Sequence, residues 1–253
     1  MKTLNNDIGV VILAAGKGTR LNCKDVPKVM LKIGGRAIVS YIIQTLFGMG
    51  FGKDRIAVVV GFQKEKVREY FGDSFIYAHQ SEQLGTAHAA YIGMKTLPAN
   101  IKDVLVIGGD DSAFYTQEML LDFLDKHKKS GVVLSLLTAE IANTPNVGRI
   151  VRHPDGMIEI IEKEYLTEEQ KKIKEISTGT FCFDRAWFEG MFTTMPKLRK
   201  LGEYGLPTAV AMAREKKLPL QFIKLANPDE WFGVNTLEEF EEANKRKNMK
   251  HET

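Results

Sequence analysis

A glycine-rich, basic loop near the N-terminus carries the residue types that could act on phosphate. Gly16 and Gly18 let backbone N–H groups approach an anion closely, because no Cβ intervenes. Lys17 and Arg20 add positive charge, and arginine can hold two phosphate oxygens at once. The spacing matches neither a P-loop nor the dinucleotide fingerprint, which needs a third small residue where Leu21 stands. We therefore predict a phosphate-binding loop of another kind. The alternative is a strand–helix turn whose basic residues have no role.

Polar residues farther along the chain extend this candidate site. Pro27 fixes the local backbone, so Lys28 stands at a defined point after the basic loop, which favours a phosphate-binding role over a solvated position. Asp110 and Asp111 follow an apolar run. A carboxylate there suits Mg²⁺, which prefers oxygen ligands, and equally suits a turn or the N-cap of a helix expected from Thr116. The residues alone leave both interpretations open.

Alternating apolar and helical patterns predict the elements that position these loops. Strands are expected at 8–15, 55–61, 74–78, 103–107, 132–138, 178–183 and 220–224. Helices are expected at 37–49, 63–71, 86–97, 116–129, 167–174, 206–215 and 237–247. A hairpin is expected at 148–152 and 157–163, turning at 154–156. Strand–helix alternation predicts an α/β fold with a largely parallel sheet, and no linker divides residues 1–253, so we expect a single domain.

Composition limits the class of protein. Hydrophobic residues make up 44% and charged residues 26% of the 253 residues, which is typical of a globular chain. A net charge of +3 argues against wholesale binding of nucleic acid or membrane. No apolar run approaches the roughly 20 residues of a membrane span, and no signal peptide is evident. Cys23 and Cys182 match no zinc spacing, so we expect reduced thiols in a cytoplasmic protein.

Several segments, taken together, resemble the sugar-nucleotide pyrophosphorylases, and above all the uridylyltransferase domains of bifunctional N-acetylglucosamine-1-phosphate uridylyltransferases. The first segment runs from Leu13 to Leu21 and is followed by Pro27-Lys28-Val29. The others keep the family's order: Gln80 to Ala89, Gly148-Arg149-Ile150, Glu162-Lys163, Ser177-Thr178-Gly179, Gly202-Glu203-Tyr204 and Gly233-Val234-Asn235. The resemblance implies a Rossmann-like, three-layer nucleotide-diphospho-sugar transferase fold, with a mixed, mostly parallel sheet and a small β-hairpin insertion.

The resemblance also implies an activity: a nucleotidylyltransferase joins a nucleoside triphosphate, with UTP favoured, to a sugar 1-phosphate and releases pyrophosphate, with Mg²⁺ as cofactor. The residues expected to contact the nucleotide are Ala14, Ala15, Gly16, Gly18, Gln80, Gly85 and Thr86. Arg20 and Lys28 are the expected catalytic residues, Asp110 and Asn235 the expected Mg²⁺ ligands, and Gly148, Glu162 and Ser177 the expected sugar-binding residues. Two roles stay open for Asp111: a cap, or a residue that supports a metal ligand without binding the metal itself.

This chemistry suits the residues found. One anion attacks another, so fixed positive charge must offset their repulsion, and no general base is needed because a phosphate oxygen is already ionised. Three positions on the sugar side depart from the family: Ser177 replaces an asparagine, Gly108 a tyrosine and Thr208 an acidic residue. The identity of the sugar therefore stays open.

Two alternatives to this activity remain. The first is a cytidylyltransferase acting on another phosphorylated substrate, and the second is a catalytically inactive regulator that binds a nucleotide sugar. Acetyl transfer is not expected, because the hexapeptide repeats of the bifunctional relatives do not occur in these 253 residues.

Overall fold

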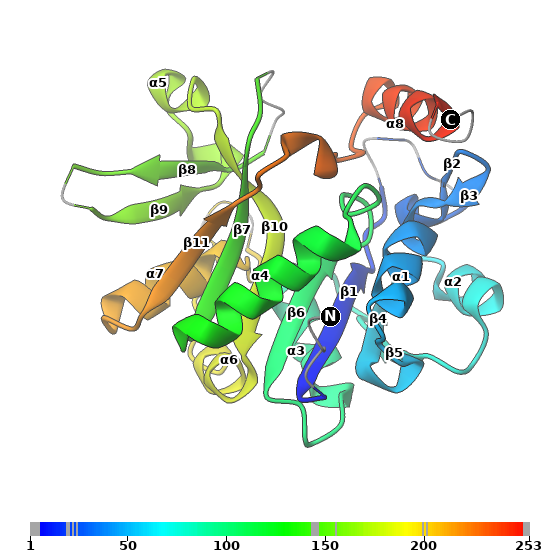
Figure 1. Cartoon of the computed structure of the whole chain (residues 1–253), viewed down its shortest axis with the longest axis horizontal. Coiled ribbons are helices and arrows are strands. Elements are labelled where there is room, and N and C mark those ends of the chain that lie inside the picture. The colour runs from blue at the N-terminus through cyan, green and yellow to red at the C-terminus, as the bar shows by residue number, and fades with distance from the viewer. Residues whose placement is uncertain are drawn as a thin grey trace.

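A nine-stranded sheet forms the centre of the computed structural model, which describes residues 6–18, 21, 23, 25–142, 147–154, 156–198, 200 and 202–249 (Figure 1). The strands follow the order β11-β7-β10-β6-β1-β4-β5, and the hairpin β8–β9 joins the sheet through β10. Their bounds are β1 Ile8–Ala14, β4 Ile56–Val60, β5 Ile76–His79, β6 Asp103–Gly108, β7 Leu134–Glu140, β8 Arg149–Arg152, β9 Ile158–Ile161, β10 Glu175–Asp184 and β11 Leu220–Lys224. A separate two-stranded hairpin, which the sequence did not predict, pairs β2 Lys32–Ile33 with β3 Arg36–Ala37.

The predicted mixed, mostly parallel sheet is confirmed. The neighbouring pairs β11–β7, β6–β1, β1–β4 and β4–β5 are parallel. Strand β10 runs antiparallel to both of its neighbours, β6 and β7. Because β1, β4, β5 and β6 are parallel, the loops that follow them open at one edge of the sheet, which is where ligands bind in folds of this kind.

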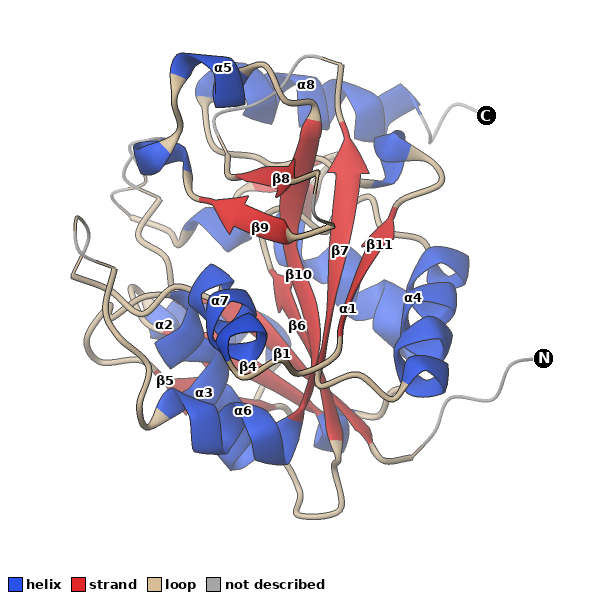
Figure 2. Cartoon of the chain, turned by 90° about the vertical axis from the view of Figure 1, so that its left-hand side faces the viewer, coloured by secondary structure: helices blue, strands red, loops and turns tan. Residues whose placement is uncertain are grey.

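Helices cover both faces of the sheet, in the three layers expected (Figure 2). The helices are α1 Ile38–Gly48, α2 Lys64–Phe71, α3 Thr86–Thr96, α4 Gln117–Ser130, α5 Glu168–Lys171, α6 Arg185–Phe192, α7 Pro207–Glu215 and α8 Leu237–Met249. Alternate side chains of β1 divide between the layers. Val10 and Ile12 pack in the cluster that includes α1 and α4, while Val11 packs in the cluster that includes α3, α6 and α7. Burial on both faces explains why the first strand is apolar at every position.

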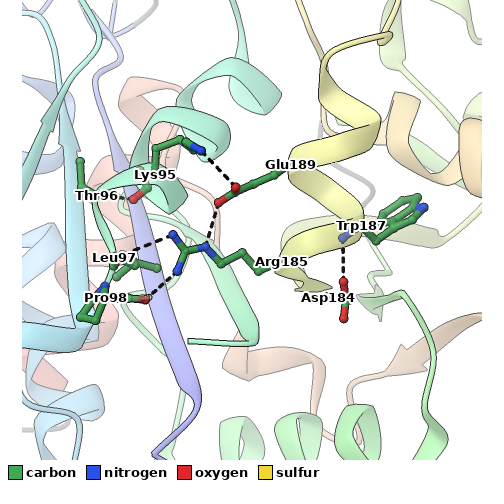
Figure 3. Close-up of polar contacts among 9 residues, drawn as sticks. Lys95, Thr96, Leu97, Pro98, Asp184, Arg185, Trp187 and Glu189 are labelled. Carbon is green, nitrogen blue, oxygen red and sulfur yellow. Dashed lines mark hydrogen bonds and ion pairs between the residues drawn. The ribbon is translucent and has the colours of Figure 1, made fainter. Parts of the chain in front are cut away.

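Helix α6 was not predicted, because its aromatic residues were assigned only to the core. Phe188 is indeed buried there. The helix begins where Asp184 accepts a hydrogen bond from the backbone N–H of Trp187 at 2.7 Å. Figure 3 shows how Arg185 ties this end to the segment after α3: its guanidinium donates to the carbonyl oxygens of Leu97 and Pro98 at 3.3 and 2.6 Å. A charged side chain therefore joins two helices on one face of the sheet.

Two predicted boundaries were wrong around the turn from α5 to β10. Helix α5 ends at Lys171, earlier than the expected residue 174, because the chain enters β10 at Glu175. The strand itself was expected only from residue 178. Its register against β7 shifts between Ser177 and Phe181, so the first residues pair across an irregularity that periodicity does not reveal. Bulges of this kind commonly lie beside active sites.

Candidate active site

A cavity of about 480 Å³ opens at the carboxyl edge of the parallel strands. The residues predicted for the site that line it are Ala15, Gly16, Gln80, Gly85, Thr86, Asp110, Gly148, Glu162, Ser177 and Asn235. Segments far apart in the sequence thus meet around one space. The nucleotide, metal and sugar positions expected from the resemblance all contribute to its wall.

Three of the predicted residues that the structure describes do not line this cavity. Ala14 is 1% exposed and packs into the core of the sheet, so its side chain faces away from the cavity. Gly18 and Lys28 are not among the lining residues either, but Lys28 contacts Asp110 and Asn235, which are. Arg20 lies outside the described residues.

Lys28 connects the glycine loop to the expected metal ligands. Its Nζ donates to the side-chain oxygen of Asn235 at 2.9 Å and forms an ion pair with the carboxylate of Asp110. Only 11% of the lysine side chain is exposed, so this ammonium group is largely shielded from solvent. Gly18 has a φ of +65°, and a Cβ there would lie 2.8 Å from the Cβ of Lys28. The second glycine of the loop therefore makes room for the lysine stem.

The first glycine of the loop differs from the second. Gly16 is exposed, and a Cβ built on it would meet no described atom within 4 Å. Packing within the protein thus gives no reason for a glycine at this position. Close approach of a ligand to the backbone would give one.

The oxygens of Asp110 and Asn235 converge on one cation, the ammonium group of Lys28. Such hard oxygen donors fit Mg²⁺, which keeps several waters and needs few protein ligands. Among the described residues, no group of three or more His, Cys, Asp or Glu residues could hold a metal. Asn235 is in turn held by Glu239, whose carboxylate accepts from its backbone N–H at 2.6 Å.

The capping interpretation of the acidic pair is wrong for helix α4. Thr116 is the N-cap of this helix, and its hydroxyl accepts from the backbone N–H of Met119 at 3.2 Å. Asp110 and Asp111 are thus not needed at the helix end. Both instead line the cavity.

The loop expected to hold the nucleobase is fixed from several sides. Gln80 is 5% exposed, and its Nε2 lies 3.1 Å from both the carbonyl oxygen of Gly85 and Nδ1 of His88. Burial lowers the pKa of His88, which favours a neutral ring that accepts this hydrogen bond. Gln83, to which sequence analysis assigned no role, donates from Nε2 to the carbonyl oxygen of Ala15 at 2.9 Å and so joins the two loops.

Gly85 lies against a chain segment distant in sequence. Its φ is +100°, and a Cβ would lie 2.5 Å from the carbonyl oxygen of Tyr204. The backbones of both segments are hydrogen-bonded, because Tyr204 N–H donates to Leu84 and Ala87 N–H donates to Tyr204, each at 2.8 Å. Thr86 adds a further bond by accepting from the N–H of Leu206 at 3.1 Å. The segment around Tyr204 therefore supports the loop that ends at Gly85.

The expected sugar side is formed by the hairpin and β10. A Cβ on Gly148 would lie 3.1 Å from the carbonyl oxygen of Ile161 and 3.5 Å from Oε2 of Glu162, so the glycine lets the two segments come close. Burial, with a contribution from Glu164, raises the pKa of Glu162. Ser177 accepts a hydrogen bond from the N–H of Gly179 at 3.3 Å.

Asp111 also lines the cavity, although the sequence assigned it no definite role, and a Cβ on Gly179 would lie 3.4 Å from its Oδ2. Its Oδ1 is buried and has no hydrogen-bond partner among the described residues. Burial, reinforced by the neighbouring Asp110 carboxylate, raises the pKa of Asp111 well above its usual range. Thr208, which like Ser177 departs from the family, also has a buried hydroxyl oxygen that lacks a partner within the described part of the chain.

Comparison with known proteins places this site in a family. The model described as nucleotidyl transferase matches residues 9–249, and the chain therefore belongs to the nucleotidyl transferase family, as the sequence segments predicted. The bifunctional protein GlmU of Heliobacterium modesticaldum is 34% identical over 234 residues, which are 92% of this chain and 50% of that protein. GlmU of Bacillus mycoides is 36% identical over 229 residues, 89% of this chain and 48% of the relative. The chain spans about half the length of these curated relatives.

A solved structure confirms the fold. A crystal structure of a candidate glucose-1-phosphate thymidylyltransferase from Bacillus anthracis, in complex with sucrose, superposes with a TM-score of 0.77. The two sequences are 20% identical, and the match covers 95% of each chain. No helix within the described residues is long and apolar enough to cross a membrane.

Proposed function

We propose that this chain is a Mg²⁺-dependent sugar-1-phosphate nucleotidylyltransferase that joins a nucleoside triphosphate, with UTP favoured, to a sugar 1-phosphate and releases pyrophosphate. One observation carries the proposal: the glycine loop, the Asp110–Lys28–Asn235 cluster and the expected sugar side surround one cavity. The relatives named GlmU and the candidate thymidylyltransferase support the same reaction class. We also propose that the protein acts in the cytoplasm, which its two free cysteines suit.

The proposed reaction is a displacement at the α-phosphorus. An ionised oxygen of the sugar phosphate forms a bond to this phosphorus, and the bond to the bridging oxygen of the β-phosphate breaks. Pyrophosphate leaves with the electron pair. The attacking oxygen carries no proton, so the chain's task is to position the reactants and neutralise charge rather than to transfer protons.

Each part of the cavity has a role in this proposal. The backbone of the glycine loop, including Gly16, would receive the phosphates, and Lys28 would supply fixed positive charge as charge moves to the leaving group. Arg20 would add a second cation, as the sequence indicates. Mg²⁺ held by Asp110 and Asn235 would supply the divalent charge that neutralises the phosphate groups. The loop of Gln80 would meet the nucleobase.

A screen for pyrophosphate release tests the proposal. Four nucleoside triphosphates are crossed with a set of sugar 1-phosphates in the presence of Mg²⁺, and the products are identified by mass. The proposal expects release that depends on both substrates and on Mg²⁺, together with a nucleotide sugar of matching mass. Release only with CTP and another phosphorylated alcohol would support a cytidylyltransferase. Tight binding of a nucleotide sugar without exchange of labelled pyrophosphate would support an inactive regulator.

A further inference from the structure

Asp111 is the polar group in the cavity that the proposed mechanism leaves unused. It lies at the end of β6, directly after the expected metal ligand Asp110. No hydrogen bond from the described residues reaches its buried Oδ1. A buried carboxylate oxygen without a partner is costly, so a site that retains one is expected to satisfy it with a ligand or water.

Two glycines make the space that this carboxylate occupies. A Cβ on Gly108, the last residue of β6, would lie 2.5 Å from Oδ1 of Asp111. A Cβ on Gly179, in the irregular part of β10, would lie 3.4 Å from Oδ2. Any larger residue at position 108 would therefore have to displace the carboxyl group. Gly108 and Asp111 thus form one structural unit.

This unit lies beside an expected sugar-binding residue. A Cβ on Gly179 would lie 3.4 Å from Oδ2 of Asp111, and the N–H of Gly179 donates to Oγ of Ser177 at 3.3 Å. The expected metal ligands are instead joined by Lys28, to which Asp111 forms no hydrogen bond or ion pair among the described contacts. Asp111 also lines the cavity, so its carboxyl group can meet a hydroxyl group of a bound sugar, although Oδ1 itself is buried.

We infer that Asp111 is a sugar-binding residue that hydrogen-bonds a substrate hydroxyl group, and that Gly108 admits it. The inference rests on the proposed function.

Substitutions at the unit separate this role from a general structural one. Asp111→Ala removes the acceptor, and Asp111→Asn keeps its shape. Each variant is assayed for pyrophosphate release with the nucleotide and sugar that serve the unaltered protein. For Asp111→Ala we expect the KM for the sugar 1-phosphate to rise about 10- to 100-fold, the value of one hydrogen bond to a charged or buried group, with the KM for the triphosphate unchanged within about twofold. Asp73, whose side chain is 91% exposed, is not a lining residue of the cavity, so Asp73→Asn is the matched control and should leave both constants unchanged.

Gly108→Ala provides an independent test because it leaves Asp111 in the sequence. Its Cβ should displace the carboxyl group and raise the KM for the sugar in the same way. The double variant Gly108→Ala/Asp111→Ala should then have a KM for the sugar no higher than that of the more impaired single variant, because both substitutions remove the same contact. Additive losses, or an unchanged KM for the sugar in all three variants, would overturn the inference. A changed Mg²⁺ requirement in Asp111→Asn at an unchanged sugar KM would show a metal ligand instead.

If no sugar and nucleotide pair releases pyrophosphate, the proposed function itself fails, an outcome distinct from normal turnover with an unaltered sugar KM.

Discussion

Replacing Lys28 by alanine should slow turnover far more than it disturbs the fold. The lysine side chain is 11% exposed and its ammonium group contacts both Asp110 and Asn235, so it is a preorganised charge at the point where the expected metal ligands meet. Loss of one such donor typically costs about 100- to 1000-fold in kcat. Asp110 is 29% exposed and can be rehydrated when the lysine is absent, so we expect a stability loss of only about 1 kcal/mol.

The assay measures kcat for pyrophosphate release at saturating substrates, together with the melting temperature and the Mg²⁺ concentration for half-maximal rate. Lys28→Arg is the matched control, because it keeps the charge but not the compact ammonium geometry, and it should recover part of the rate. Since Lys28 competes for the oxygens of Asp110 and Asn235, its removal should not raise the Mg²⁺ requirement. A kcat for Lys28→Ala within about threefold of the unaltered protein would refute the catalytic role assigned by analogy with preorganised donors.

Three further substitutions test the site and the fold that supports it. Gly16→Ala should raise the KM for the triphosphate about 10-fold at unchanged melting temperature, because its Cβ meets no protein atom but would crowd a bound phosphate; an unchanged KM would count against the phosphate cradle. Gly85→Ala, at a φ of +100° and 2.5 Å from a backbone oxygen, should instead lower stability by about 1–3 kcal/mol, as thermal unfolding would reveal, and a normal melting curve would contradict this strain. Glu175→Gln should destabilise the protein by about 1–2 kcal/mol at pH 7, because hydrogen bonds from Arg152 and Thr138 outweigh burial and lower the pKa of Glu175. That stabilisation is present above the unfolded pKa of about 4.3 and is lost as the pH falls through the folded value, so denaturant unfolding should show the two proteins converging in acid; a difference independent of pH would contradict it.

The sequence predicted the elements whose side-chain pattern follows directly from burial. The first strand is apolar at every position because both of its faces are covered, and this continuous run is visible without a structure. Asp110 could be selected because polar residues after a buried strand reach the ligand-binding edge of a parallel sheet. Asn235 has no such local signal, and only the resemblance to a family suggested it.

The features that escaped prediction depend on contacts between distant segments. Gln83 reads as an ordinary loop residue until its bond to Ala15 is seen. Asp111 could not be given a role, because its surroundings depend on an irregularity in β10 that places Gly179 beside the end of β6. The helix that begins at Arg185 was missed for a different reason: its Asp184 cap is a local signal, but its aromatic residues were assigned only to the core.

A crystal structure with Mg²⁺ and the nucleotide sugar formed in the screen would show directly where the substrate binds. We expect the diphosphate between the backbone at Gly16 and the Nζ of Lys28, with the base beside Gln80 and the sugar facing Glu162 and Asp111. A nucleotide sugar bound outside this cavity, or one whose diphosphate lies away from both the glycine loop and Lys28, would contradict it.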